Sequence, residues 1–254
     1  MISPIEINQT LCNEFNEHGH VKIKNLINKE DISILEKEID KLIRSLEDSN
    51  NLSKFKRNDF GKGFLEVTNL WTKSNRIKKL VHSRQLAEIS AKLLNVNGVR
   101  LHYDCILYKS AKSGPTPWHQ DQVAWPLDTD KTITLWIPIN NLSEKLGSLN
   151  FLTSSHKYGE LSLRKALRQR SKEFNYGSLE VGDVTFHSGW TFHSANPNHL
   201  DTTRKAFAII YYADGAKLTK MDRSDEKDDF YQFFPNVKVG ELANSHLNPL
   251  LYSS

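Results

Sequence analysis

The 254-residue sequence has no long hydrophobic run and only two cysteines. A helix that crosses a bilayer needs about 18 or more consecutive apolar residues, and no stretch approaches that length. The first ten residues, MISPIEINQT, have neither the positive nor the apolar segment of a secretion signal. We therefore expect a cytoplasmic protein without a membrane partner.

The cysteines, Cys12 and Cys105, lie far apart and form neither a CxxC motif nor a metal-binding spacing. A disulfide framework in a secreted domain needs several closely spaced cysteines. The sequence thus predicts two reduced thiols and excludes a cysteine metal site.

Strong charge of one sign is also missing, because the net charge is +4 and the lysines are spread along the chain. Nucleic-acid binding is therefore not expected. One segment, LSLRKALRQRSKEF, places several cations beside leucines at near-helical spacing. This pattern is typical of a solvated helix face, and an anion-attracting rim near a site is the alternative. Its cations are Arg164, Lys165, Arg168, Arg170 and Lys172.

The composition, 38% hydrophobic and 25% charged, is that of an ordinary globular protein, and we expect one domain over residues 1–254. Residues 1–98 are expected to be mainly helical. Apolar residues recur at helical spacing from Leu11 to His18, in a long helix after Asn28, and from Arg84 to Leu94. A short strand is expected in HVKIKNL.

Residues 99–215 consist instead of short runs rich in β-branched and aromatic residues, separated by Gly, Pro, Asn and Ser. Such spacing favours an antiparallel sandwich or barrel. We predict an α+β fold with a double-stranded β-helix (jelly-roll, cupin-like) core and flanking N-terminal helices. The tail, 216–254, contains the acidic run MDRSDEKDDF, which we expect to be an exposed loop.

Two His-x-Asp pairs occur, His102 with Asp104 and His119 with Asp121. Residues two apart in a strand point to the same face, so either pair can present an imidazole and a carboxylate to one metal ion. The first pair lies in the middle of a predicted strand, where a polar outward face is the ordinary outcome. The second follows the loop KSAKSGPTP, at a strand start where functional residues are often placed.

A 2-His-1-carboxylate site, the ligand set of non-haem iron oxygenases, needs one more histidine. The segment GDVTFHSGWTFHSANPN offers two, His187 and His193. His156 ends another predicted strand and is more typical of a loop or pocket residue. The residues alone leave the choice of the third ligand open.

Several motifs together resemble the phytanoyl-CoA dioxygenase family of iron(II)- and 2-oxoglutarate-dependent oxygenases. They are WHQD, LWIPINN, GSLNFLTSSH, GDVTFHSGWTFHSANPN, TTRKAFAIIYYA and the N-terminal FNEHGHVKIKNLINKEDISILEKEIDKL, which together cover residues 12 to 215 approximately. The resemblance implies a jelly-roll oxygenase that uses Fe(II), 2-oxoglutarate and dioxygen.

The resemblance also implies roles for individual residues. In the family the second iron histidine stands ten residues after the aspartate of a Gly-Asp pair, and Asp183 thereby selects His193. An arginine eleven residues further on, here Arg204, binds the distal carboxylate of 2-oxoglutarate. A planar guanidinium suits that task because it can hold a carboxylate through two parallel hydrogen bonds. Trp125 occupies a position where an aromatic residue packs against the co-substrate in the related ectoine hydroxylase.

Two departures from the family pattern are present. The serine often found two residues after the second histidine is Ala195, so its hydrogen bond would be absent or supplied by Thr202 or Asn198. The familiar Pro-Gly-Ser-His is TSSH, which leaves the role of His156 open.

The family couples conversion of 2-oxoglutarate to succinate and carbon dioxide with oxidation of a substrate. Because halogenases of this superfamily replace the carboxylate by a small residue, Asp121 argues for hydroxylation of a C–H bond of a small molecule, which the basic segment suggests is anionic. Two alternatives remain: a metal-dependent jelly-roll enzyme that does not use 2-oxoglutarate, and a non-catalytic ligand-binding relative.

Overall fold

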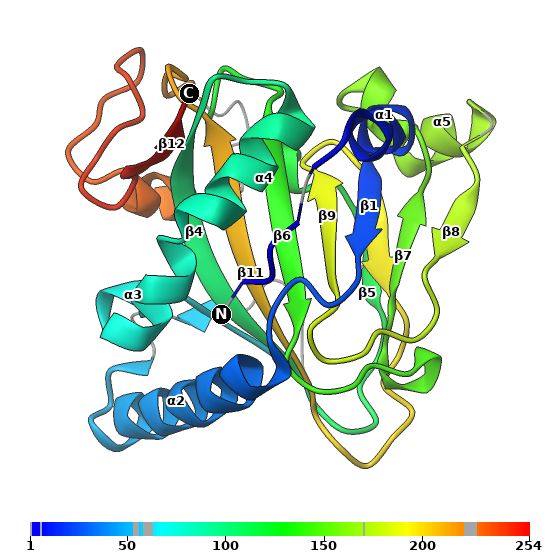
Figure 1. Cartoon of the computed structure of the whole chain (residues 1–254), viewed down its shortest axis with the longest axis vertical. Coiled ribbons are helices and arrows are strands. Elements are labelled where there is room, and N and C mark those ends of the chain that lie inside the picture. Colours follow the sequence, from blue (N-terminus) through cyan, green and yellow to red (C-terminus); the bar gives the residue numbers. More distant parts are fainter. Residues whose placement is uncertain (1, 6, 53–55, 58–62, 170, 221–227) are drawn as a thin grey trace.

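Two antiparallel sheets face each other in the computed structural model, which describes the chain except residues 1, 6, 53–55, 58–62, 170 and 221–227 (Figure 1). The larger sheet has the order β1-β9-β6-β11-β4-β3-β2, with β12 also paired to β4, and the smaller sheet has the order β5-β10-β7-β8. The large-sheet strands are β1 (His20–Ile23), β2 (Lys56–Arg57), β3 (Phe64–Thr68), β4 (Gly98–Lys109), β6 (Thr132–Pro138), β9 (Val184–Ser188), β11 (Arg204–Ala213) and β12 (Leu250–Ser253). The small-sheet strands are β5 (Thr116–His119), β7 (Leu149–Leu152), β8 (Glu173–Asn175) and β10 (His193–Ala195).

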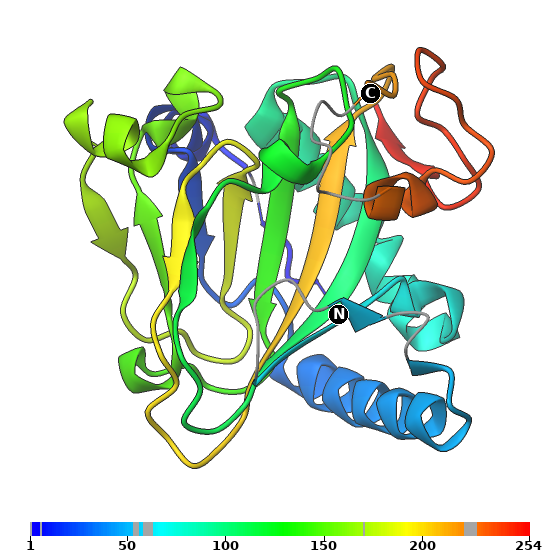
Figure 2. The ribbon, with the colours of Figure 1, turned by 180° about the vertical axis from the view of Figure 1, so that it is seen from behind.

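Helices cover the outer face of the large sheet, as the view from behind also shows (Figure 2). The long helix begins where predicted, because Asn28 accepts a hydrogen bond from the backbone N–H of Glu30 and caps it. The α-helices are α1 (Gln9–His18), α2 (Lys29–Asp48), α3 (Asn75–Val81), α4 (Arg84–Leu94) and α5 (Leu163–Arg168). The 3₁₀ helices are η2 (Leu70–Thr72), η3 (Asp121–Ala124), η4 (Glu144–Leu146), η5 (Ser155–Tyr158) and η6 (Asp228–Phe233). No helix in the described ranges combines the length and apolar character that a membrane crossing requires.

Strand alternation divides the hydrophobic core into two layers. On β11, Phe207 and Ile209 pack beneath the helices, whereas Ala206, Ala208 and Ile210 face the space between the sheets. Large side chains thus fix the helices to the sheet, and the inner face keeps small residues near its middle. Space for ligands is therefore expected between the sheets.

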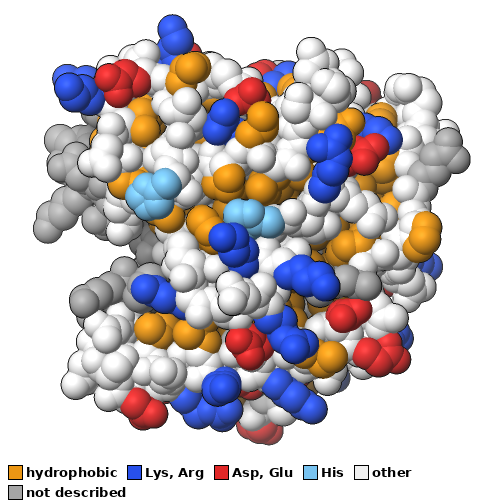
Figure 3. All heavy atoms as spheres, turned by 60° about the vertical axis from the view of Figure 1, so that its left-hand side comes forward, with side chains coloured by type: hydrophobic (Ala, Val, Ile, Leu, Met, Phe, Trp, Pro, Cys, Tyr) orange, Lys and Arg blue, Asp and Glu red, His pale blue; other side chains and the backbone are white. Residues whose placement is uncertain are grey.

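Most predicted elements are confirmed: the three helices, the strand in HVKIKNL and the strands between residues 99 and 215. Between the long helix and Arg84 the chain also forms β3, η2 and α3, which were not predicted from the sequence. Most of the acidic run MDRSDEKDDF lies outside the described residues. On the face shown in Figure 3, basic side chains are interspersed with acidic and hydrophobic ones.

The first His-x-Asp pair, His102 and Asp104, is fully buried in β4, so the expected outward polar face is wrong. A β-bulge explains the difference. Along β11 the Cα partners pass from Tyr103 to Leu101 and skip His102, which breaks the alternation of faces.

The bulge sends the two side chains to opposite faces of the sheet. The His102 ring lies among aromatic rings of the inner layer, with its centroid 5.0 Å from that of Phe234. Asp104 instead accepts hydrogen bonds from the backbone N–H groups of Leu70 and Trp71, on the helix-covered side. This pair therefore cannot bind one metal ion.

Candidate metal centre

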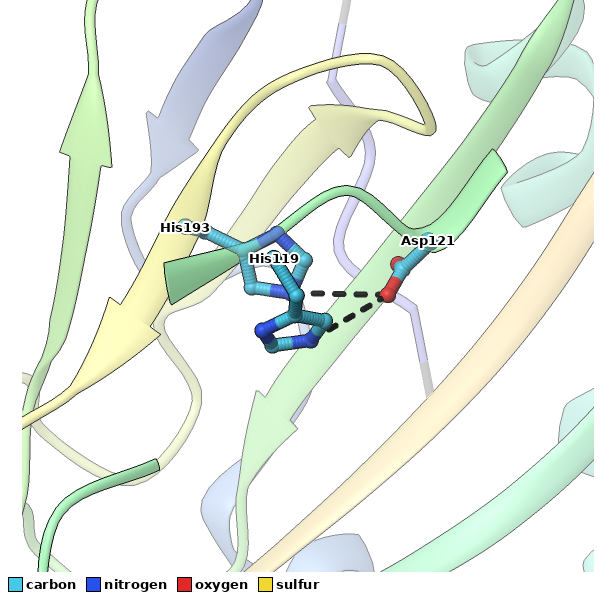
Figure 4. A group of neighbouring side chains, drawn as sticks. All are labelled: His119, Asp121 and His193. Carbon is cyan, nitrogen blue, oxygen red and sulfur yellow. Dashed lines mark ion pairs between the residues drawn. The ribbon is translucent and has the colours of Figure 1, made fainter. Parts of the chain in front are cut away.

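The second pair, His119 and Asp121, lies beside the strand that carries His193. β5 ends at His119 and η3 begins at Asp121, while β5 and β10 pair so that His119 and His193 are Cα partners. The two imidazole rings have centroids 4.1 Å apart. Figure 4 shows these rings beside the carboxylate of Asp121. The structure thus brings together the three predicted metal-binding residues.

The donor atoms of these three side chains converge on a single oxygen. Nε2 of His119 lies 3.5 Å and Nε2 of His193 3.6 Å from Oδ1 of Asp121. All three donor atoms lie within 4.8 Å of one another, and within the described ranges this is the one such group spaced for a metal ion. The His119 and Asp121 side chains are 27% and 19% exposed and that of His193 8%, so the cluster is open to solvent on one side.

Backbone carbonyls fix the tautomer of both histidines. Nδ1 of His119 lies 2.8 Å from the carbonyl oxygen of Pro117, and Nδ1 of His193 lies 3.1 Å from that of Thr191. A carbonyl only accepts, so each Nδ1 carries the proton and donates it. Each Nε2 therefore keeps its lone pair for a metal ion, which is the usual arrangement of metal-binding histidines.

The second carboxylate oxygen of Asp121 is held separately. Oγ1 of Thr134 donates to Oδ2 at 3.0 Å, and Nε2 of His187 lies 3.4 Å from it. Nδ1 of His187 is buried with no hydrogen-bond partner in the described part of the chain, which places the proton of this imidazole on Nε2. His187 thus contacts Asp121 from the side, and neither it nor Thr134 was assigned this contact from the sequence.

The charge states of the cluster suit metal binding. Burial raises the pKa of Asp121, but the neighbouring imidazoles of His193, His119 and His187 hold it well below its usual range. Burial, and then the adjacent His119, lower the pKa of His193 well below its usual value. Burial also lowers the pKa of His119, but Asp121 outweighs burial and raises it. At neutral pH Asp121 is therefore a carboxylate and His193 a neutral imidazole, which are the forms that a metal ion binds.

Arg204, predicted to bind a carboxylate, begins β11 and is buried between the sheets at 2% exposure. Its guanidinium carbon lies 5.5 Å from the centre of the Trp136 ring, and its Nε has no hydrogen-bond partner among the described residues. Burial lowers its pKa to about 10, so it remains charged at neutral pH. A buried cation with an unsatisfied donor fits a carboxylate ligand. The next inward residues of β11, Ala206 and Ala208, are small.

Trp125 follows η3 directly and is buried in the inner layer. Its ring packs edge-on against that of His102, with the centroids 5.4 Å apart. This contact belongs to the core, and contact with a co-substrate stays a prediction.

Of the two suggested substitutes for the missing serine, Asn198 is engaged elsewhere and Thr202 is exposed. The side-chain amide of Asn198 donates to the carbonyls of Lys109, Ser110 and Thr202. Thr202 itself is exposed, whereas Ala195 is buried. His156 lies in η5, where its Nε2 is 3.1 Å from the carbonyl of Asn16, which ties η5 to α1.

The basic segment contains the short helix α5 and the start of β8, and Arg170 lies outside the described residues. Gln120 lies between His119 and Asp121 in the sequence. Its side chain binds the segment that leads into α5. Its Nε2 donates to the carbonyls of Gly159 and Trp190, and its Oε1 accepts from the backbone N–H of Leu161. The basic segment is thereby held next to the cluster.

Comparison with known proteins agrees with this geometry. The family model described as phytanoyl-CoA dioxygenase (PhyH) matches residues 15–206. A protein of Stutzerimonas stutzeri described as a probable alpha-ketoglutarate-dependent hypophosphite dioxygenase is 30% identical over 220 residues, which covers 79% of this chain and 76% of that protein.

Three solved structures share the fold, which confirms the jelly-roll prediction. The carbocyclase SnoK from nogalamycin biosynthesis has a TM-score of 0.81 at 19% identity, with 96% of each chain covered. The epimerase SnoN, in complex with Fe3+, alpha ketoglutarate and nogalamycin RO, has a TM-score of 0.80 at 19% identity over 96% of this chain and 98% of that chain. EctD from S. alaskensis with 2-oxoglutarate and 5-hydroxyectoine has a TM-score of 0.78 at 16% identity over 95% and 86%.

The family match spans most of the chain and the sequence relative covers more than two thirds of it. The chain therefore belongs to the phytanoyl-CoA dioxygenase family of iron- and 2-oxoglutarate-dependent oxygenases.

Proposed function

We propose that this protein is a hydroxylase that oxidises a C–H bond of a small, anionic molecule and releases succinate and carbon dioxide. His119, Asp121 and His193 bind the iron, Arg204 binds the distal carboxylate of 2-oxoglutarate, and Trp125 packs near it. The observation that carries this proposal is the convergence of the Nε2 atoms of two histidines on one carboxylate oxygen.

When bound, iron with 2-oxoglutarate and dioxygen supplies the oxidising chemistry, and the protein supplies ligands, orientation and a dry pocket. The carbonyls of Pro117 and Thr191 keep both imidazoles in the ligand tautomer. Thr134 and His187 hold the second oxygen of Asp121, which leaves Oδ1 facing the two histidines. The rings and carboxylate are thus oriented before a metal ion arrives.

An anionic substrate is supported by the basic segment around α5. Arg164 and Arg168 are exposed, and Gln120 holds the preceding turn against the cluster. The Stutzerimonas stutzeri relative is described as acting on hypophosphite, itself a small anion. Charge reversal at Arg168 and Arg170 should raise the substrate KM, and an unchanged KM would remove the support for an anion.

The same relative favours a second candidate, oxidation of a P–H bond in a small phosphorus oxyanion. Hypophosphite-dependent succinate formation above the substrate-free background would support this candidate. A carbon compound that alone stimulates succinate formation would support the C–H hydroxylase.

The experiment that tests the proposal is a panel of small anions incubated with protein, iron(II), ascorbate and 2-oxoglutarate under air. We expect substrate-dependent succinate formation that is abolished by His119→Ala, Asp121→Ala or His193→Ala. Near-normal turnover by any of these variants would contradict the assignment. Turnover without 2-oxoglutarate would favour the other metal-dependent chemistry, and ligand binding that needs no iron, without any turnover, would favour a non-catalytic relative.

A further inference from the structure

A second buried cation, Lys109, lies beside Arg204. The two residues are Cα partners on neighbouring strands, Lys109 at the end of β4 and Arg204 at the start of β11. Each is only 2% exposed. Partners in antiparallel strands direct their side chains to the same face, which here is the inner face between the sheets. In the described part of the chain, no ion pair joins either cation to a carboxylate.

The lysine side chain crosses to the small sheet. Its Nζ donates to the carbonyl of Asn196 at 2.8 Å and to that of Ala195 at 3.4 Å. An ammonium group has three N–H donors, and these two hydrogen bonds use two of them. Among the described residues the third N–H has no partner, so it can donate to a ligand. Nζ therefore stands beside the position where the family often has a serine hydroxyl.

Gly147 makes this position of the lysine possible. A Cβ at residue 147 would lie 3.3 Å from Cδ of Lys109 and 2.8 Å from the carbonyl oxygen of Asn196. Any other residue would push the lysine or the carbonyl aside. The close approach thus depends on a position without a side chain.

Two neighbouring buried cations are unfavourable unless an anion joins them. Burial, and then the charge of Arg204, lower the pKa of Lys109 to about 7. The carbonyls of Asn196 and Ala195 accept hydrogen bonds from the ammonium group, but they are neutral and do not balance its charge. An anionic ligand between the two side chains removes this conflict.

We propose that Lys109 and Arg204 together bind the distal carboxylate of 2-oxoglutarate, with the Lys109 ammonium taking the place of the hydroxyl that Ala195 lacks. The inference rests on the proposed function and adds a co-substrate contact to it. Arg204 provides a planar pair of donors, and Lys109 provides a compact charge at the oxygen that the arginine leaves exposed.

The test compares two 2-oxo acids, 2-oxoglutarate and pyruvate, on the iron(II)-loaded protein without oxygen. Pyruvate has the same keto acid end but no distal carboxylate. For Lys109→Met we expect the Kd of 2-oxoglutarate, measured by calorimetry, to rise about 10- to 100-fold, the usual effect of losing a hydrogen bond to a charged group. The Kd values of pyruvate and of iron(II) should stay within about twofold of the wild type, because the metal cluster is untouched.

A rescue variant separates binding from a merely structural role. Adding Ala195→Ser to Lys109→Met restores a hydroxyl near the same oxygen and should recover most of the lost 2-oxoglutarate affinity. The matched control is Lys112→Met, at an exposed lysine whose Nζ donates to the carbonyl of His199. It should leave the Kd of 2-oxoglutarate unchanged. If Lys109→Met does not fold, Lys109→Gln, which keeps a donor for Asn196, is measured in the same way.

Unchanged 2-oxoglutarate affinity in Lys109→Met, or an equal loss for pyruvate, would overturn the inference. A wild-type protein that does not bind 2-oxoglutarate would instead contradict the proposed function. If Arg204→Ala weakens 2-oxoglutarate binding and Lys109→Met does not, the proposed function stands and only the role of Lys109 is contradicted.

Discussion

Nε2 of His187 lies 3.4 Å from Oδ2 of Asp121, the carboxylate oxygen that does not face the other two histidines. Because Nδ1 of His187 has no hydrogen-bond partner among the described residues, its proton is on Nε2 and is donated to Asp121. Thr134 donates to the same oxygen. His187 is therefore a positioning residue for the carboxylate and leaves Oδ1 available to a metal ion.

Removing this contact should weaken metal binding. For His187→Ala we expect the affinity for iron(II) or cobalt(II) to fall about 10- to 100-fold, the usual effect of losing a hydrogen bond to a metal ligand. Metal titration by calorimetry measures it. His199→Ala, at an exposed histidine, is the matched control. Equal metal affinity in the two variants would mean that His187 does not orient Asp121.

Arg204→Ala should weaken 2-oxoglutarate binding by about 2–5 kcal/mol, because a buried carboxylate loses its charged partner. The Kd of 2-oxoglutarate with iron(II) present measures the effect, and Arg84→Ala, at an exposed arginine, is the control. If 2-oxoglutarate binds both variants equally, the carboxylate lies elsewhere.

The stability of the protein should depend on pH through Asp104. Burial raises the pKa of this carboxyl to about 7, although the N–H groups of Trp71 and Leu70 oppose the shift. The folded state then holds a proton that the unfolded state, with its ordinary value of 3.8, has lost. This contribution to the unfolding free energy is therefore fully present below about pH 4 and is lost as pH rises to about 7.

Urea unfolding of the wild type and of Asp104→Asn across this range measures that contribution. The fall in unfolding free energy between about pH 4 and 7 should be smaller in the variant, because asparagine has no proton to lose. The same pH dependence in both proteins would show that Asp104 is ionised throughout.

Two glycines with nearly equal backbone angles allow a matched test of close packing. Gly147 has φ +90° and Gly215 has φ +91°, but of the two only Gly147 has neighbours within 4 Å of the Cβ that alanine would add, the nearest being the carbonyl oxygen of Asn196 at 2.8 Å. Both alanine variants carry the strain of positive φ. Gly147→Ala should lower the unfolding free energy by about 1–3 kcal/mol more than Gly215→Ala, because it also overpacks. Equal losses would show that the Asn196 loop moves freely.

Local patterns predicted those elements whose apolar residues follow one period. The helix after Asn28 was found because it buries one face along its length, and β11 because it is a continuous apolar run buried on both faces. β5 and β12 gave no such signal, since each is short and is defined by its partner strand. The bulge at His102 likewise depends on the register with β11 and could not be predicted from alternation.

The site was predictable in part. The residues alone left His187 and His193 as alternatives, and the family spacing selected His193. In the structure His193 is the Cα partner of His119, whereas His187 belongs to the other sheet. Thr134, Gln120 and Lys109 had no local signal, since their contacts are made between distant segments.

The central claim is that two imidazoles and one carboxylate bind iron together with 2-oxoglutarate. The most direct measurement is an anaerobic titration of the protein with iron(II) in the presence of 2-oxoglutarate, followed by visible charge-transfer absorption. We expect a saturable band with one iron per chain, absent in His193→Ala and Asp121→Ala and present in His199→Ala. No band in the wild type, or an undiminished band in the His193 or Asp121 variant, would contradict the account.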